Sequence, residues 1–430
     1  MSVRIFNLPM SDKECKRSME ALMPQIEGYA RLLARRGAAV QPGQELVLTA
    51  PVEAAPFARL VIAAAYDAGA RHVTVVWNDD EALRLEYERA PKDYFEHTPS
   101  WKREQLDSLA EQGACFLFLD GTDPDALKGV DPSRPAAASR ARNSECTIWR
   151  NGLDFGRNAW SIAGVPVERW ARKVFPDVSA KEAMYDLWLA ILEVARADNA
   201  DPEAAWETHN AAFEKNKRRM NTQRFDALHY HAKNGTDLTV GLNAKGVWDG
   251  GAGRTTGGVS FFPNIPTEEV FTSPDRMRAE GKVVSAMPLV HAGSIVRDFW
   301  FRFEGGRVVD YGAAQGKAVL KEIIETDENA ARLGECALIS KNTPIRESGL
   351  LFYSTLYDEN ASCHLALGTG FPECYEGGVD MDPDQIMACG VNHSHTHVDF
   401  MIGADDLAID GITAEGEEVP VFVNGQWAWE

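Results

Sequence analysis

The 430-residue chain has few cysteines, and none of its seven belongs to a Cys-x-x-Cys pair. An odd number of cysteines cannot pair completely into disulfides. Some also lie in apolar sequence such as Ala114-Cys115-Phe116-Leu117, where a buried free thiol is the usual state. This pattern argues against a disulfide framework and indicates a reducing compartment.

Long apolar runs are also lacking. No uncharged stretch approaches the roughly 20 residues that a membrane-spanning helix requires. The N-terminus, Met1 to Asn7, has neither the basic start nor the apolar core of a signal peptide. We therefore expect a cytoplasmic protein without a membrane partner.

Positive charge is scarce, because 44 basic side chains face 64 acidic ones and the net charge is -20. This balance excludes nucleic acid as a partner, since binding to phosphates needs a basic surface. An acidic field attracts cations instead, either metal ions or the amino terminus of a peptide. A nucleotide cofactor is not expected, because no predicted strand is followed by a Gly-rich phosphate loop.

The chain is long enough for two domains. In the N-terminal half, predicted strands at 45–49, 71–77 and 115–120 alternate with predicted helices, the first from Pro24 to Arg36. Strand, helix and strand at this spacing predict a parallel sheet. After Gly235 the pattern changes to strands and turns. We predict an α/β fold, with an N-terminal doubly wound α/β domain (1–220) and a C-terminal α+β metal-binding domain (221–430).

Histidines are concentrated between residues 391 and 403, where His393, His395, His397 and Asp399 occupy alternate positions. If this stretch is a strand, all four side chains project from one face. A divalent cation reconciles neighbouring imidazoles with a carboxylate, because it binds both together. The alternative is a polar strand face whose histidines bond to nearby carbonyls.

Three further stretches of the C-terminal half combine acids with apolar sequence. Glu268 and Glu269 lie between prolines, where a helix start is the alternative. Glu335 interrupts an apolar strand, and an unpaired buried carboxylate is costly, although a solvated strand face is the alternative. Glu359 and His364 lie in the third stretch, for which a polar turn beside a core histidine is the alternative.

These four stretches resemble the signature regions of the thermophilic-type metallo-aminopeptidase family, peptidase family M29. The likeness extends into the N-terminal half, through Tyr29-Ala30-Arg31-Leu32-Leu33 and Pro91-Lys92-Asp93-Tyr94-Phe95, and covers nearly the whole chain. The resemblance implies a homodimeric hydrolase with two divalent metal ions, zinc, cobalt or manganese, in its C-terminal domain. Such an aminopeptidase releases N-terminal amino acids from peptides with a water activated by the two metals.

The resemblance also implies a role for individual residues. The implied metal ligands are Glu269, Glu335, Glu359, His364, His397 and Asp399. Among these, Glu335 is the expected bridge between the ions, whereas His393 and His395 are not ligands in the family pattern and are expected to be packed. Glu268 is the candidate general base, and an exposed acid at a helix start is its alternative.

Phe371 departs from the family pattern, because a tyrosine thought to assist catalysis usually stands seven residues beyond the His364 position. Phenylalanine lacks the hydroxyl donor that could stabilise an oxyanion. Tyr353 and Tyr375 are candidates to replace it. One alternative function is therefore a metal-binding homologue that Phe371 has deprived of peptidase activity.

The second alternative is an Fe(II)-dependent ring-cleaving dioxygenase on a related fold. Such an enzyme needs two histidines and one carboxylate at a single metal, which His364, His397 and Asp399 could provide. Three acids would then have no role, so the composition of the site favours two metals and hydrolysis.

Overall fold

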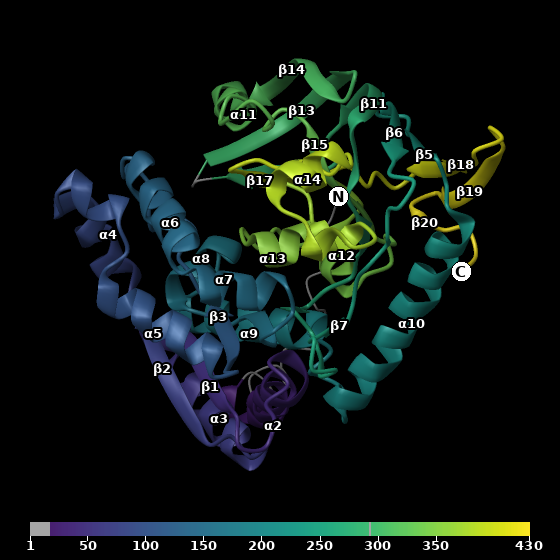
Figure 1. The fold of residues 1–430 in the computed structure, drawn as a ribbon. Coiled ribbons are helices and arrows are strands. Elements are labelled where there is room, and N and C mark those ends of the chain that lie inside the picture. The colour runs from purple at the N-terminus through teal and green to yellow at the C-terminus, as the bar shows by residue number, and fades with distance from the viewer. Residues whose placement is uncertain (1–17, 292–293) are drawn as a thin grey trace. The chain divides into compact units, whose positions relative to one another are not determined.

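The computed structural model describes residues 18–291 and 294–430, which form two compact units (Figure 1). Unit 1 comprises the described part of Met1–His209 with Ala252–Pro266 and Ser348–Leu356, and unit 2 comprises Asn210–Gly251, Thr267–Glu347 and Tyr357–Glu430. The division into independent domains at residues 220 and 221 stays a prediction. The expectation about Met1 to Asn7 lies outside the described residues, as does Cys15.

A parallel sheet of five strands organises unit 1, in the order β2-β1-β3-β4-β9. Its strands are β1 (Glu45–Pro51), β2 (His72–Asn78), β3 (Cys115–Asp120), β4 (Trp160–Gly164) and β9 (Asn264–Ile265), and a small separate pair is β7 (Gly253–Arg254) with β8 (Ser260–Phe261). The strand order reverses beside β1, as in doubly wound folds. The central strands are almost wholly buried, because helices cover a parallel sheet on both faces. The predicted α/β sheet is confirmed.

Helices precede and follow these strands. They are α2 (Met19–Leu32), η1 (Leu33–Gly37), η2 (Val52–Ala54), α3 (Ala55–Asp67), α4 (Asp80–Arg89), η3 (Lys92–Glu96), α5 (Ser100–Glu111), α6 (Ser133–Glu145), α7 (Thr147–Asp154), α8 (Glu168–Val174), α9 (Ala180–Val194) and α10 (Pro202–Gln223), the last of which runs from unit 1 into unit 2. Helix α2 begins at Met19, so the prediction that Pro24 opens it is wrong. Ser18 caps the helix, since its hydroxyl accepts a hydrogen bond from the N–H of Ala21 (3.2 Å). The missing N–H of Pro24 deprives only the exposed Glu20 carbonyl of a partner.

Unit 2 contains two antiparallel sheets. The smaller has the order β10-β15-β16-β17, and the larger has the order β12-β13-β11-β6-β5-β18-β19-β20, with β14 paired to β13. The strands are β5 (Ala227–His231), β6 (Asp237–Leu242), β10 (Val270–Thr272), β11 (Pro274–Val284), β12 (Leu289–His291), β13 (Ser294–Glu304), β14 (Arg307–Gln315), β15 (Leu333–Leu338), β16 (His364–Gly368), β17 (His397–Met401), β18 (Ala408–Ile412), β19 (Glu418–Val423) and β20 (Gln426–Trp427).

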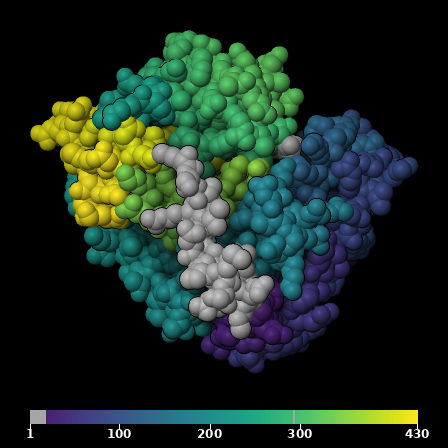
Figure 2. All heavy atoms as spheres, turned by 180° about the vertical axis from the view of Figure 1, so that it is seen from behind, coloured from purple at the N-terminus to yellow at the C-terminus, as the bar shows by residue number. Residues whose placement is uncertain are grey.

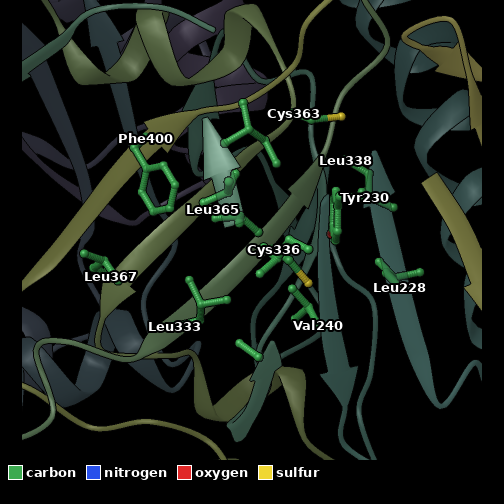
Figure 3. Close-up of a cluster of buried hydrophobic side chains, with 14 of the residues drawn as sticks. Leu228, Tyr230, Val240, Leu333, Cys336, Leu338, Cys363, Leu365, Leu367 and Phe400 are labelled. Carbon is green, nitrogen blue, oxygen red and sulfur yellow. The ribbon is translucent and has the colours of Figure 1, made fainter. Parts of the chain in front are cut away.

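The hydrophobic core of unit 2 is formed by side chains from both sheets (Figure 3). Leu228, Tyr230 and Val240 come from the larger sheet, and the smaller sheet contributes Leu333, Cys336, Leu338, Leu365, Leu367 and Phe400. In Figure 2 the yellow C-terminal residues adjoin a teal surface, in agreement with the pairing of β18 with β5. Because its inner face is anchored in this core, the smaller sheet presents its other face on a rigid support.

Short helices connect the strands of unit 2: α11 (Lys317–Ile324), α12 (Pro344–Ser348), α13 (Thr355–Asp358), η4 (Glu359–Ala361), η5 (Pro372–Cys374), η6 (Gly378–Asp380) and α14 (Pro383–Ala388). Across residues 18–291 and 294–430, no helix combines the length and apolarity needed to cross a membrane. All six described cysteines are free thiols, as the sequence predicts for these positions.

Candidate metal centre

The smaller sheet of unit 2 has one apolar face and one face of acids and imidazoles. Successive side chains of a strand point to opposite faces. Those on the polar face are Glu335, His364, His397 and Asp399. Those on the opposite face belong to the core: Cys336, Leu365, Leu367, Val398 and Phe400. Between the polar groups, Ala337 and Ala366 add only methyl groups to this face of the sheet.

A bulge in β15 lets Leu333 and Glu335 face opposite sides although they are two residues apart. The register with β16 shifts between these residues. Gly334 lies at the shift, and a Cβ there would meet the carbonyl oxygen of Thr369 at 2.2 Å. Glycine therefore lets the backbone of Thr369 approach, and Glu335 is turned out of the core.

Backbone carbonyls orient both histidines of the polar face. Nδ1 of His397 donates a hydrogen bond to the carbonyl oxygen of Thr369 (2.8 Å), and Nδ1 of His364 donates one to that of Glu359 (3.0 Å). With Nδ1 donating to the backbone, each Nε2 faces the acids and can offer a lone pair to a metal ion that displaces its proton. This arrangement is typical of histidines that bind a metal ion.

The acids and imidazoles form two overlapping triads, Glu269-Glu335-His364 and Glu335-His397-Asp399, in which the ligand atoms lie within 4.8 Å of one another. His364 Nε2 is 3.3 Å from Glu269 Oε2, and His397 Nε2 is 3.2 Å from Glu335 Oε2 and 3.1 Å from Asp399 Oδ1. Glu335 belongs to both triads. The arrangement offers two adjacent positions for a cation, with one shared carboxylate.

The remaining predicted residues lie in irregular or short elements around the triads. Glu269 precedes β10 in a segment without regular structure, so the alternative of a helix start there is wrong. Glu268 donates its backbone N–H to Asn360 Oδ1 (2.7 Å), which ties it to the turn that contains Glu359. Burial and the neighbouring carboxylates Asp399 and Glu269 raise the pKa of Glu359, which shows that it lies near the cluster.

Burial and mutual repulsion dominate the electrostatics of the cluster. Burial, with the neighbouring charge of Glu269, raises the pKa of Glu335 to about 7. Burial and the charges of Asp399 and Glu269 raise the pKa of Glu359 well above its usual range. Burial alone would lower the pKa of His364, but its hydrogen bond to Glu269 and the surrounding carboxylates raise it to about 10.

The pKa of Asp399 is shifted in the opposite direction. Burial acts to raise its pKa, but the charge and hydrogen bond of His397 outweigh burial and lower it to about 2. Four carboxylates thus surround two imidazoles, and the excess of negative charge suits divalent cations. The donor set of carboxylate oxygens and imidazole nitrogens fits zinc, cobalt or manganese.

The prediction of one strand carrying His393, His395, His397 and Asp399 on a common face is wrong for its first half. Strand β17 begins at His397, and both earlier histidines are exposed and belong to neither triad. The preceding segment bonds elsewhere: His395 donates its N–H to Asp327 Oδ2 (2.7 Å). This bond takes the place of a hydrogen bond to a neighbouring strand. The alternating histidines before His397 therefore do not lie on a strand face.

Phe371 lies beside the cluster, with its ring centroid 5.1 Å from that of His397. That Tyr375 could replace the missing hydroxyl stays a prediction; a hydrogen bond with the thiol of Cys389 raises the pKa of its phenol. Tyr353 belongs to unit 1, where Lys173 lies over its ring. Phe271 was not among the predicted site residues, although its ring centroid lies 5.4 Å from that of Phe371. The available signal was its position two residues after Glu269, because every second side chain of an extended segment faces the same side.

A family model described as thermophilic metalloprotease (M29) matches residues 23–427. The chain belongs to the M29 metalloprotease family. Membership confirms the predicted family and a hydrolase, and it implies a divalent metal cofactor.

Named relatives agree with M29 membership. Aminopeptidase 2 of Geobacillus stearothermophilus is 42% identical over 406 residues, covering 94% of this chain and 98% of that protein. Aminopeptidase AmpS of Bacillus subtilis (strain 168) is 41% identical over 411 residues, covering 96% and 100%. The aminopeptidase prediction is thereby confirmed at the level of the family.

Two solved structures are similar to the M29 chain. The structure of wild-type AmpT from Thermus thermophilus matches with a TM-score of 0.88 and 38% identity, covering 95% of this chain and 100% of that one. A 2,5-dihydroxypyridine dioxygenase from Pseudomonas putida KT2440 matches with a TM-score of 0.50 and 11% identity, covering 96% and 99%. At 11% identity the second match shows a related fold alone, and the dioxygenase alternative is the weaker one.

Proposed function

We propose that the protein is a cytoplasmic, homodimeric aminopeptidase that uses two divalent ions, zinc, cobalt or manganese, to release N-terminal amino acids from peptides. The observation that carries this proposal is the pair of triads that share Glu335. A single-iron dioxygenase site needs one such position, and a second triad would have no use there.

Different residues of the chain would bind each of the two ions. Glu269, Glu335 and His364 would hold one ion, while Glu335, His397 and Asp399 would hold the other, with Glu359 completing the donor set. When bound, the two ions supply Lewis acidity toward the scissile carbonyl and lower the pKa of a nucleophilic water. The backbone carbonyls of Thr369 and Glu359 keep each imidazole in the tautomer that can donate its Nε2 lone pair.

Glu268 is the proposed general base. It is adjacent to Glu269, and its backbone is held by Asn360, which restricts the positions open to its carboxylate. A base at this place would accept the proton of the attacking water and return it to the leaving amine. The other acids of the cluster favour the ammonium form of the peptide's free α-amino group.

Metal counting and turnover together test the function. We expect two zinc, cobalt or manganese ions per chain, and release of p-nitroaniline from aminoacyl-p-nitroanilides with added Co or Mn. One iron per chain would support the dioxygenase instead. Two ions without release from any substrate would support a metal-binding homologue that Phe371 has made inactive.

The role of Glu268 has its own test. Glu268→Gln should lower kcat by about a hundredfold or more while the metal content stays unchanged. Glu415→Gln, an exposed acid of unit 2, is the matched control and should leave kcat unchanged. Full activity of Glu268→Gln would remove this residue from the mechanism.

A further inference from the structure

Two aromatic rings adjoin the cluster in unit 2. The centroids of Phe271 and Phe371 are 5.4 Å apart at 69°, and the Phe371 centroid is 5.1 Å from that of His397 at 51°. Both phenylalanines are half-buried, so part of each ring reaches the surface of the unit. An apolar surface therefore begins immediately beside the imidazole of a proposed metal ligand.

The backbones of both phenylalanines are fixed in place. The N–H and carbonyl of Phe271 exchange hydrogen bonds with Asp249, each 2.9 Å long. The N–H of Phe371 donates to the hydroxyl of Ser273 (2.7 Å), a residue that is 1% exposed. With fixed backbones and with ring contacts to each other and to His397, the two side chains lose little freedom when a ligand covers them, which favours binding.

We propose that Phe271 and Phe371 form the apolar wall of a subsite for the side chain of the substrate's N-terminal residue. The inference rests on the proposed function and names its substrate class as peptides that begin with a large apolar residue. An exopeptidase that holds the α-amine and first carbonyl at the cluster has the first side chain as its nearest apolar group. Covering the two rings removes apolar surface from water, which an alanine or a charged side chain achieves poorly.

Substrate preference gives the direct test. The ratio of kcat/KM for leucyl-p-nitroanilide over alanyl-p-nitroanilide should fall about tenfold in Phe271→Ala, because one apolar pocket wall discriminates side chains by about this factor. Phe371→Leu keeps an apolar side chain but loses the ring, and should lower the ratio for phenylalanyl over alanyl substrate. Tyr311→Ala, a half-buried aromatic of β14, is the matched control and should leave both ratios unchanged.

Dipeptide substrates test whether Phe271 and Phe371 contact the first or the second side chain of a peptide. Wild-type protein should prefer leucyl-alanine over alanyl-leucine, and Phe271→Ala should lose this preference. A preference for the second residue would overturn the assignment. An equal loss on all substrates would also overturn it, because that result indicates a structural role for the ring.

Calorimetry separates this inference from the proposed function. Free L-leucine should bind the metal-loaded protein more tightly than L-alanine, and Phe271→Ala should bind both equally. If no peptide is hydrolysed but leucine binding still depends on Phe271, the peptidase proposal fails and the subsite stands. If peptides are hydrolysed and leucine binds wild type and variant alike, the subsite fails and the peptidase proposal stands.

Discussion

Acidic side chains gather in both units, and the two clusters balance their charge in different ways. In unit 1 they follow the carboxyl ends of the parallel strands. Asp120 accepts a hydrogen bond from the hydroxyl of Ser354 (3.0 Å), and Asp80 accepts one from the N–H of Asp123 (2.8 Å). Asp123 also lies 3.7 Å from Arg169. Hydroxyl, backbone and guanidinium groups of the protein compensate this cluster.

In unit 2 the compensation is different. In the part of the chain that the structure describes, the carboxylates of the triads form ion pairs with His364 and His397, and with no lysine or arginine. A buried carboxylate without a cation is costly, and two imidazoles cannot balance four acids. A buried acidic cluster whose charged partners are histidines, a residue type that commonly binds metal ions, therefore indicates a metal site more strongly than a cluster paired with arginine.

Removing one acid from each cluster should reveal the largest difference between the two units. Glu335→Ala should lose both metal ions and lower kcat/KM by about a thousandfold or more, because Glu335 belongs to both triads. Asp120→Ala in unit 1 should keep both ions. Metal analysis of the two purified variants, with turnover measured beside it, gives the result. Two ions retained in Glu335→Ala would show that the bridging assignment is wrong.

Removing the metal should destabilise the protein. An ion at a free concentration of a thousand times its Kd stabilises the folded state by about 4 kcal/mol, and a chelator removes this contribution. Thermal unfolding with and without chelator measures the effect. An unchanged Tm after complete metal removal would contradict the proposed site.

The pH dependence of the metal-free protein follows from the cluster. The raised pKa values of Glu335 (about 7) and His364 (about 10) mean that the folded chain binds more protons than the unfolded chain. Stability from these groups is present below their unfolded pKa values and is lost as the pH rises through about 7 and then about 10. Denaturant unfolding of chelated protein at about pH 5.5 and about pH 9 should show this loss, and bound metal should remove it.

Phe371→Tyr tests whether the cluster of unit 2 lacks a hydrogen-bond donor. A hydroxyl at the edge of this ring adds a hydrogen-bond donor beside His397, and kcat should rise by about tenfold or more. Tyr311→Phe, which changes one hydroxyl on a half-buried aromatic of β14, is the control and should leave kcat unchanged. The aminoacyl-p-nitroanilide assay measures both variants. No rise in kcat for Phe371→Tyr would indicate that the chain does not need this donor.

The smallest expected effect concerns Asp327, which holds the segment before β17. Its carboxylate accepts hydrogen bonds from the hydroxyl of Ser394 and the N–H of His395, both 2.7 Å long. Burial acts to raise its pKa, but these bonds outweigh burial and lower it. Asp327→Asn should cost about 1 to 2 kcal/mol of unfolding free energy at neutral pH, measured with urea.

The acid side of the pH range gives a check on Asp327. Its contribution is present above its unfolded pKa and is lost as the pH falls through the lower folded pKa. Asp327→Asn should therefore differ most from wild type near neutral pH and least in strong acid. Asp384→Asn, an exposed acid of α14, is the control and should match wild type throughout.

Sequence patterns predicted those parts of the fold that depend on local alternation. The apolar run at 115–120 predicted β3, whose observed bounds are Cys115–Asp120, because a buried parallel strand is apolar on both faces. The same reasoning failed at His393 and His395. Alternation allows a strand but does not create one, and there the N–H of His395 bonds to Asp327 instead of a neighbouring strand.

The composition of the candidate site was predictable, but its geometry was not. Acids and histidines in apolar sequence indicated a metal site. The resemblance to the family predicted which of these residues are its ligands. The bulge at Gly334, the carbonyl of Thr369 that sets the tautomer of His397, and the ring of Phe271 had no usable local signal. Each depends on a partner far away along the chain.

The acidic balance of the chain, the parallel strands of unit 1 and the kinds of side chain available for a metal could all be derived from the order of amino acids alone. Tertiary structure decided that Glu269, Glu335, His364, His397 and Asp399 form two triads with one shared acid. The physical reason is strand register. Pairing of β15, β16 and β17 places Glu335 and Asp399, 64 positions apart in the chain, on one face of a sheet, whose opposite face is held by the hydrophobic core.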